Sequence, residues 1–136
     1  MLKVAVIGAG SWGTALANIA AENANCTYLW VRRKKLADEM IETHENRLYL
    51  PGVKISTEIK ISTNLNEVAS KADIVIMAVP SHAVRVMVKQ LRYHLKNDAV
   101  VVSASKGIEL DSFKRMSQVL AEELYDGDNK NIVALS

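Results

Sequence analysis

The amino-acid sequence predicts a doubly wound α/β domain, in which a mainly parallel β-sheet carries helices on both faces. Short apolar runs, typical of strands that are buried on both sides, alternate with segments of helical periodicity. A glycine-rich segment also joins the first apolar run to the first helical segment. The length of 136 residues suits one such domain, and we expect it to span residues 1–136.

Six apolar runs are predicted to be strands, at residues 3–7, 27–31, 59–62, 74–79, 99–104 and 132–135. Helices are expected at residues 14–21 and 36–45, and two further helical faces are predicted from the spacing of their apolar residues. These faces are Val84, Met87, Val88, Leu91 and Leu95, and then Phe113, Met116, Leu120 and Leu124. Pro51-Gly52 is expected to break the chain, and Asp126-Gly127-Asp128-Asn129 to form a turn before the last strand.

The glycine-rich segment follows the first strand directly and reads Gly8-Ala9-Gly10-Ser11-Trp12-Gly13. Between a strand and a helix, this spacing is the dinucleotide-binding fingerprint of Rossmann-type folds. Gly8 allows the tight turn, Gly10 lets the backbone approach a pyrophosphate, and Gly13 lets the helix pack close to the strand. The pyrophosphate is expected at the helix N-terminus, near Ser11 and Trp12. The alternative is a glycine-rich turn that only connects strand to helix.

A basic run, Arg32-Arg33-Lys34-Lys35, follows the second strand, where NAD-binding proteins usually place an Asp or Glu for the ribose 2′-hydroxyl. Four cations at a helix start oppose the helix dipole, and a nearby anion would reverse that effect. The run therefore predicts a site for the 2′-phosphate of NADP, with NADPH preferred and NAD accepted. A solvated basic run is the alternative, which suits Lys34 and Lys35 better than Arg32 and Arg33.

Further polar residues follow the fourth and fifth predicted strands, namely Pro80-Ser81 and Ser105-Lys106-Gly107. Ligands of open α/β sheets bind beyond the carboxyl ends of the strands, so these residues are expected to share one crevice with the glycine-rich turn. The Lys106 ammonium could stabilise a carbonyl oxygen that gains negative charge as hydride arrives, or it could be a surface residue of a loop. His82 could donate a proton, although a structural role is the alternative that we prefer.

Composition excludes several classes of function. The chain is 49% hydrophobic and 24% charged, as in globular proteins, and its net charge of +2 gives no reason to expect a nucleic-acid partner. One cysteine permits no internal disulfide and no cysteine-rich metal site, and we expect no metal. No apolar run is long enough to span a bilayer, and the first strand begins too early for a signal peptide. A cytoplasmic protein is expected.

An ordered set of motifs runs along the whole chain. After the glycine-rich turn come Trp30-Val31-Arg32, Asn46-Arg47-Leu48-Tyr49-Leu50-Pro51-Gly52, Ala78-Val79-Pro80-Ser81 and Lys106-Gly107-Ile108-Glu109. Taken together, these motifs resemble the bacterial NAD(P)-dependent glycerol-3-phosphate dehydrogenases. The resemblance implies reversible hydride transfer between NAD(P)H and dihydroxyacetone phosphate, giving sn-glycerol 3-phosphate for phospholipid synthesis. It also implies that Ser11, Trp12, Arg32, Arg33 and Tyr49 contact NADPH, and that Lys106 touches both cofactor and substrate.

The resembled family continues beyond the equivalent of Leu135-Ser136 with a helical substrate domain that carries its principal catalytic lysine. We therefore expect this chain to be the N-terminal, cofactor-binding part of a longer enzyme, with a small-molecule substrate and with its oligomeric state, a homodimer included, left open. Two other functions stay open: a module that senses NAD(P)H and catalyses nothing, and a related two-domain reductase of a hydroxy acid or ketopantoate. The motif from Asn46 to Gly52 argues against the second.

Overall fold

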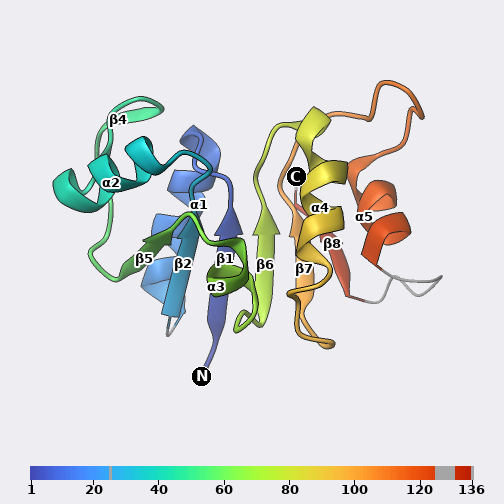
Figure 1. Cartoon of the computed structure of the whole chain (residues 1–136), viewed down its shortest axis with the longest axis horizontal. Coiled ribbons are helices and arrows are strands. Elements are labelled where there is room, and N and C mark those ends of the chain that lie inside the picture. The colour runs from blue at the N-terminus through green and yellow to red at the C-terminus, as the bar shows by residue number, and fades with distance from the viewer. Residues whose placement is uncertain (25, 125–130, 136) are drawn as a thin grey trace.

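Six parallel strands form the central sheet of the computed structural model, which describes residues 1–24, 26–124 and 131–135. In chain order they are β1 (Lys3–Ile7), β2 (Cys26–Trp30), β5 (Ile59–Ser62), β6 (Ile74–Met77), β7 (Val100–Ser103) and β8 (Ile132–Ala134). Their order across the sheet is β5-β2-β1-β6-β7-β8, and every pairing within it is parallel (Figure 1). The six predicted strands and the doubly wound fold are confirmed, and each strand end lies within two residues of its predicted place.

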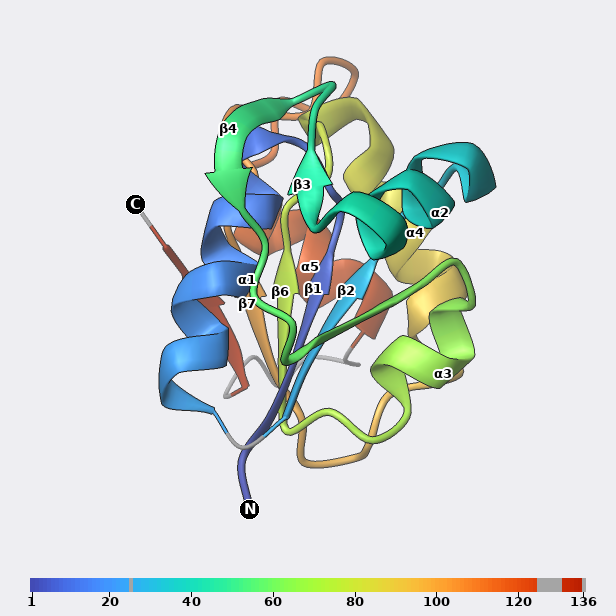
Figure 2. The ribbon, with the colours of Figure 1, turned by 90° about the vertical axis from the view of Figure 1, so that its left-hand side faces the viewer.

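Helices cover both faces of this sheet (Figures 1 and 2). From β1 the chain moves to β2 on one side, and from β6 it moves to β7 and β8 on the other. Because parallel crossovers are right-handed, these two directions place their helices on opposite faces. Accordingly, α1 (Ser11–Asn23) lies on one face, whereas α3 (Leu65–Ala69), α4 (Val84–Leu91) and α5 (Met116–Leu124) lie on the other. The five-residue α3 was not predicted, because it is too short to show a periodicity.

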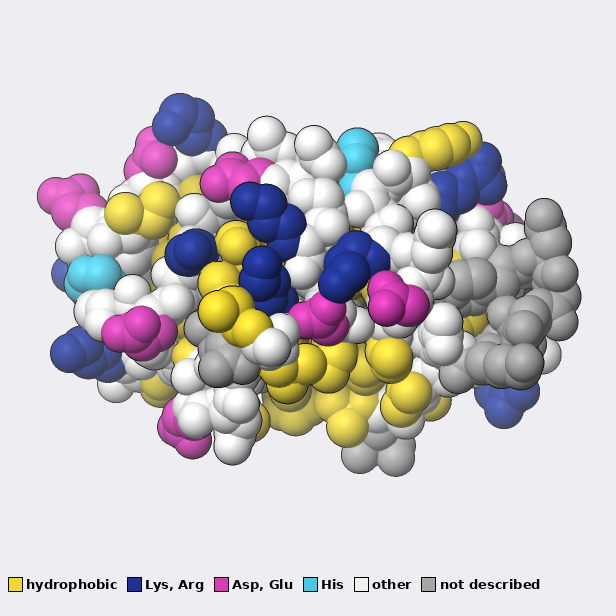
Figure 3. Space-filling model, turned by 90° about the horizontal axis from the view of Figure 1, so that it is seen from below, with side chains coloured by type: hydrophobic (Ala, Val, Ile, Leu, Met, Phe, Trp, Pro, Cys, Tyr) yellow, Lys and Arg dark blue, Asp and Glu magenta, His cyan; other side chains and the backbone are white. Residues whose placement is uncertain are grey.

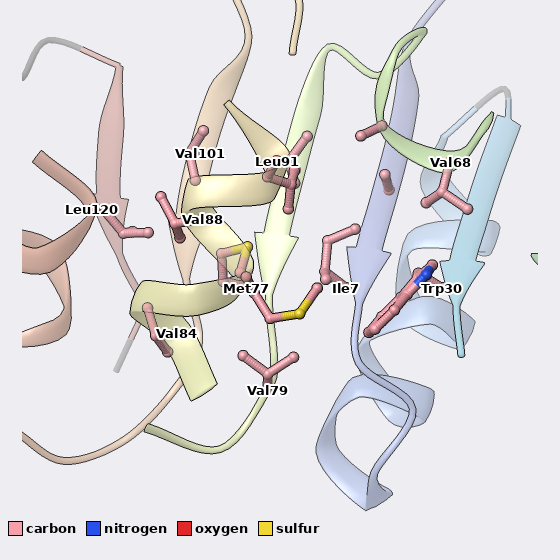
Figure 4. Close-up of a cluster of buried hydrophobic side chains, with 14 of the residues drawn as sticks. Ile7, Trp30, Val68, Met77, Val79, Val84, Val88, Leu91, Val101 and Leu120 are labelled. Carbon is pink, nitrogen blue, oxygen red and sulfur yellow. The ribbon is translucent and has the colours of Figure 1, made fainter. Parts of the chain in front are cut away.

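The sheet separates two clusters of buried apolar side chains. The larger cluster packs β1, β6 and β7 against α3, α4 and α5, and it includes Ile7, Trp30, Met77, Leu91 and Leu120 (Figure 4). The smaller cluster joins the other face of β1 and β2 to α1 and α2 (Lys34–Thr43), through Val6, Ala17, Leu29, Leu36 and Met40. Burial on both faces explains the nearly continuous apolar runs of β1 and β6, whereas the edge strand β5 carries Lys60 and Ser62.

A short antiparallel hairpin follows α2 and stands beyond the carboxyl ends of the strands (Figure 2). Its strands are β3 (Glu45–Asn46) and β4 (Leu50–Lys54). The α2 helix ends at His44, whose left-handed backbone (φ 53°) turns the chain into β3. The expected chain break at Pro51-Gly52 is wrong, since both residues lie within β4. Proline is tolerated there because a two-stranded hairpin leaves β4 with a free edge.

A second correction concerns Phe113, which was predicted on the apolar face of the last helix. The helix begins only at Met116, and Phe113 lies in the preceding loop with 75% of its surface exposed and φ of 58°. Leu95 lies beyond the end of α4 but still packs against the larger cluster. The predicted turn at residues 126–129 falls outside the described residues.

The edge of the sheet where the strands begin carries charges of both signs (Figure 3). Among them, Asp73 accepts hydrogen bonds from the Lys96 ammonium at 2.5 Å and from the Lys3 backbone N–H at 2.9 Å. These donors lower the pKa of Asp73. Within the described part of the chain, no helix combines the length and the apolar character needed to cross a bilayer.

Candidate functional site

A cleft of about 700 Å³ opens at the carboxyl ends of β1, β2, β6 and β7, along the upper edge of the sheet in Figure 1. Its walls come from residues 8–13, 30–33, 78–81 and 104–106, together with Ala83 and with single residues of α2, α4 and the hairpin. Four of these groups follow four different strands, as the sequence predicted. These groups converge beside β1 and β6, where the strand order reverses. Ligands of such sheets usually bind at this position.

The glycine-rich turn is shaped by close approaches of the backbone. Gly8 has φ of +116°, and a Cβ there would lie 2.7 Å from the Ala78 carbonyl oxygen. A Cβ on Gly13 would overlap the carbonyl oxygen of Gly8, so α1 approaches the end of β1 more closely than any side chain allows. A Cβ on Gly10 would meet no atom within 4 Å. Gly10 therefore leaves open space, which a bound group can fill.

Helix α1 starts at this turn with its first N–H groups available to a ligand. Gly10 occupies the N-cap position, no side chain caps the helix, and no acidic residue lies in its first turn. The first N–H groups of a helix have no partner within the helix, and the helix dipole makes this end positive. The turn and the helix start together suit an anion such as a pyrophosphate.

Two tryptophans line the cleft in different ways. Trp12, in the first turn of α1, is 46% exposed, whereas Trp30 is 8% exposed and belongs to the larger apolar cluster. The Trp30 indole N–H donates to the Thr63 carbonyl oxygen at 2.9 Å, which fixes the ring at the base of the cleft. Trp12 stays free to lie against a bound group.

The basic run divides into two pairs. Arg32 and Arg33 line the cleft, and the Arg33 guanidinium donates a 2.8 Å hydrogen bond to the Tyr49 hydroxyl. Lys34 and Lys35 are not among the lining residues, and Lys34 instead pairs with Asp38 one helical turn away, at 3.1 Å in solvent. The two arginines therefore face the cleft, whereas Lys34 and Lys35 are exposed outside its lining.

At the other end of the cleft, Ser105 and Lys106 follow β7. The Ser105 hydroxyl donates to the Val79 carbonyl oxygen at 2.6 Å, which ties the ends of β6 and β7 together. The exposed Lys106 ammonium lines the cleft and donates to the Leu135 carbonyl oxygen at 3.3 Å. Pro80 also lines the cleft, whereas His82 is exposed and lies outside the lining. The structure thus brings Lys106 and Pro80 to the site and leaves His82 out.

The loop that follows Lys106 is held by Arg85, a residue that sequence reasoning missed. The Arg85 guanidinium donates two hydrogen bonds to Glu109, at 2.7 and 2.8 Å, and one to Glu123 of α5 at 2.7 Å. It also forms an ion pair with Glu122 of α5 at 2.9 Å. Hydrogen bonds from Arg85 and Ser112 lower the pKa of Glu109 to about 2. The motif containing Glu109 was the available signal, but its partner lies 24 residues away in α4.

Within the described residues, no group of three His, Cys, Asp or Glu side chains could hold a metal ion. The groups that gather at the cleft are backbone N–H groups, arginines, a lysine and aromatic rings. They suit an anionic organic ligand with flat rings.

Comparison with known proteins decides the family. Residues 3–136 match the model of a family described as NAD-dependent glycerol-3-phosphate dehydrogenase N-terminus. The chain belongs to this family.

Among curated proteins, glycerol-3-phosphate dehydrogenase [NAD(P)+] of Bacillus subtilis is 46% identical to this chain. The match covers 100% of this chain and 39% of that protein. It is 42% identical to the protein of the same name from Listeria monocytogenes serotype 4a, over 98% of the chain and 40% of that protein. The chain thus spans about two fifths of the length of these relatives.

Solved structures extend the likeness to the fold. The glycerol-3-phosphate dehydrogenase of Saccharomyces cerevisiae superposes with a TM-score of 0.86 at 27% identity, over 99% of this chain and 41% of that one. The glycerol-3-phosphate dehydrogenase of Coxiella burnetii superposes with a TM-score of 0.84 at 27% identity, over 92% of this chain and 38% of that one. A ketopantoate reductase from Ralstonia eutropha superposes with a TM-score of 0.72 at 21% identity, over 98% of this chain and 40% of that one. This likeness shows a shared fold alone.

The nicotinamide dinucleotide that the family description implies can be tested against the cleft of this chain. Open space at Gly10 leaves room for a pyrophosphate, the start of α1 offers free N–H groups, and Arg32 and Arg33 lie at the end of β2. The volume of about 700 Å³ lies within the range of small-molecule sites, roughly 300–1,000 Å³. These residues fit the cofactor.

Proposed function

We propose that residues 1–136 form the NAD(P)-binding domain of a longer enzyme that interconverts dihydroxyacetone phosphate and sn-glycerol 3-phosphate. The observation that carries this proposal is the position of the glycine-rich turn and the arginine pair in one cleft of a chain that belongs to the dehydrogenase family. When bound, the nicotinamide ring would supply a hydride to the substrate carbonyl carbon. The product would be a precursor for phospholipid synthesis.

The residues divide the cofactor between them in this proposal. The pyrophosphate would lie on the turn and the start of α1, where Trp12 can cover it. The 2′-phosphate would meet Arg32 and Arg33, with Tyr49 beside them, so that NADPH is preferred and NAD accepted. The proposed cofactor-binding residues are Gly8, Gly10, Ser11, Trp12, Gly13, Arg32, Arg33, Tyr49, Pro80 and Lys106.

Lys106 is proposed to touch the substrate as well. Its ammonium extends from the end of β7 on the side of the cleft away from the arginine pair, and its three N–H donors can hold the substrate oxygen as negative charge develops on it. The principal catalytic lysine is expected beyond residue 136. Because dihydroxyacetone phosphate and the dinucleotide are water-soluble, we also propose that the enzyme acts in the cytoplasm.

The test is an assay of the full-length protein by the loss of NADPH absorbance, with dihydroxyacetone phosphate, ketopantoate and a 2-keto acid offered in parallel. We expect oxidation only with dihydroxyacetone phosphate. Faster turnover of ketopantoate or of the keto acid would replace this reaction with that of another two-domain reductase. NADPH binding with no turnover of any of the three would favour the alternative of a sensing module. Sedimentation of the same sample shows whether the enzyme is a homodimer.

A further inference from the structure

Asn46, in strand β3 of the hairpin, is completely buried against the glycine-rich turn. Its side-chain amide donates to the Ala9 carbonyl oxygen at 2.8 Å and to the Thr14 hydroxyl at 2.9 Å. Its side-chain oxygen accepts the Tyr49 backbone N–H at 3.1 Å. Both amide protons and the oxygen are thereby engaged, so this side chain has one orientation and an exact set of partners.

The bonds to Ala9 and Thr14 fix the pyrophosphate end of the cleft. Ala9 lies inside the turn, and the peptide that joins it to Gly10 is trans, since the described chain contains no cis peptide. In a trans peptide the N–H points opposite to the carbonyl. Holding the Ala9 carbonyl against Asn46 therefore fixes the direction of the Gly10 N–H. The bond to Thr14, which is itself buried, fixes the same side chain to the first turns of α1.

The bond to Tyr49 fixes the opposite wall. Tyr49 follows β3 in the hairpin, and its hydroxyl accepts the hydrogen bond from Arg33. The Arg33 guanidinium also lies 6.0 Å from the centre of the Tyr49 ring. A continuous series of contacts thus runs from the turn, through Asn46 and Tyr49, to Arg33. Its two ends are the places where the proposed function puts the pyrophosphate and the 2′-phosphate.

We propose that Asn46 is a positioning residue, which sets the spacing between the pyrophosphate-binding turn and the 2′-phosphate-binding wall of the cleft. This inference rests on the proposed function. Aspartate has the same shape but lacks both donors, and it would place a carboxylate against the Ala9 carbonyl. Asparagine alone among the side chains of this size supplies two donors and one acceptor in this geometry.

The test compares Asn46→Asp with Asn18→Asp in the full-length protein. Asn18 is a matched control because it also ties α1 to the segment around the hairpin, donating to the Lys54 carbonyl oxygen at 3.0 Å and accepting the Ser56 N–H at 3.0 Å, but it does not line the cleft. Calorimetry gives the dissociation constants of NADPH and NADH for each variant, and thermal unfolding gives its Tm. We expect Asn46→Asp to raise the dissociation constant of NADPH about tenfold, as loss of hydrogen bonds at one end of the ligand predicts. The dissociation constant of NADH should rise less, because NADH carries no 2′-phosphate to meet the second wall.

Asn18→Asp should leave both dissociation constants within about twofold, whatever its effect on Tm. An Asn46→Asp protein that is folded and binds NADPH as well as the unmutated protein would overturn the inference, and so would an equal loss in Asn18→Asp. Failure of the proposed function has a different result, namely that the unmutated protein binds neither dinucleotide.

A second measurement needs no variant at Asn46. Adding 2′-AMP, which carries the 2′-phosphate and no pyrophosphate, to the ¹⁵N-labelled unmutated protein should shift the side-chain amide signal of Asn46 and the backbone amide signal of Gly10. If the signals of Tyr49 move while those of Asn46 and Gly10 do not, the two walls are not coupled through Asn46.

Discussion

The Arg33 guanidinium and the Tyr49 hydroxyl are joined by a 2.8 Å hydrogen bond, although 16 residues separate them in the sequence. Arg33 is the residue before α2, and Tyr49 belongs to the hairpin that follows α2. The tyrosine thus holds a long, flexible cation at the rim of the cleft. Preorganisation of this kind lowers the entropy lost on binding.

Cofactor preference should depend on this arginine pair. A guanidinium pairs with a phosphate through two hydrogen bonds and gains little from a hydroxyl, so NADPH should bind roughly tenfold better than NADH. Replacing Arg32 and Arg33 together with Ala should remove most of this preference, mainly by weakening NADPH. Calorimetric titration at fixed salt measures both. The control is Lys34→Ala with Lys35→Ala, which changes the net charge equally but lies outside the cleft lining. Equal affinities in the unmutated protein would refute the 2′-phosphate site.

Two glycines of the same turn should respond differently to alanine. In Gly13→Ala the new methyl group overlaps the Gly8 carbonyl, and such overpacking lowers the free energy of unfolding by about 1–3 kcal/mol. Gly10→Ala adds a methyl group to open space, so its Tm should stay close to that of the unmutated protein while NADPH binding is lost. Thermal unfolding and calorimetry on both variants separate the effects. A Gly10→Ala protein that binds NADPH normally would mean that the pyrophosphate lies elsewhere.

Removing the Lys106 ammonium should reduce catalysis by the full-length enzyme. Loss of one donor to a developing negative charge costs about 2.7–4 kcal/mol, or 10²–10³ in rate. Lys106→Ala should therefore lower kcat/KM by about that factor, while the dissociation constant of NADPH changes much less. Lys89→Ala, an exposed lysine on α4, is the matched control and should have no effect. Activity of Lys106→Ala within threefold of the unmutated enzyme would make Lys106 a surface residue.

The Arg85–Glu109 pair predicts a dependence of stability on pH. The folded pKa of Glu109, about 2, lies below its ordinary value of 4.5, so the pair contributes stability above about pH 4.5 and loses it as the pH falls toward 2. Glu109→Gln should lower Tm at pH 7, and its difference from the unmutated protein should shrink across this window. Glu58→Gln serves as the control, because Glu58 is an exposed glutamate that does not line the cleft. A Tm difference that stays constant from pH 7 to pH 2 would contradict the pairing.

Local patterns predicted much of this architecture because the central strands are nearly continuous apolar runs, and because β1, β2, β6 and β7 are each followed by residues that line the cleft. Glycine spacing likewise located the turn, since the fit of α1 against β1 excludes a side chain at Gly13. Long-range polar contacts gave no such signal. Asn46 contacts Ala9 across 37 positions, and Arg85 contacts Glu109 across 24, so nothing near either residue in the sequence indicates its partner. Phe113 was misplaced because its spacing from Met116 and Leu120 is helical although its backbone is not.

The position of β1 in the middle of the sheet has a consequence for folding during synthesis. The ribosome synthesises β1 first. Its two neighbours in the sheet come later, since β2 begins at Cys26 and β6 begins at Ile74. One edge of β1 therefore has no partner until more than half of the chain has been synthesised. Pairings this distant in sequence form slowly, and an open apolar strand edge is a template for association with other chains. Until Ile74–Met77 has left the ribosome, the nascent domain therefore exposes this edge of β1 to such association.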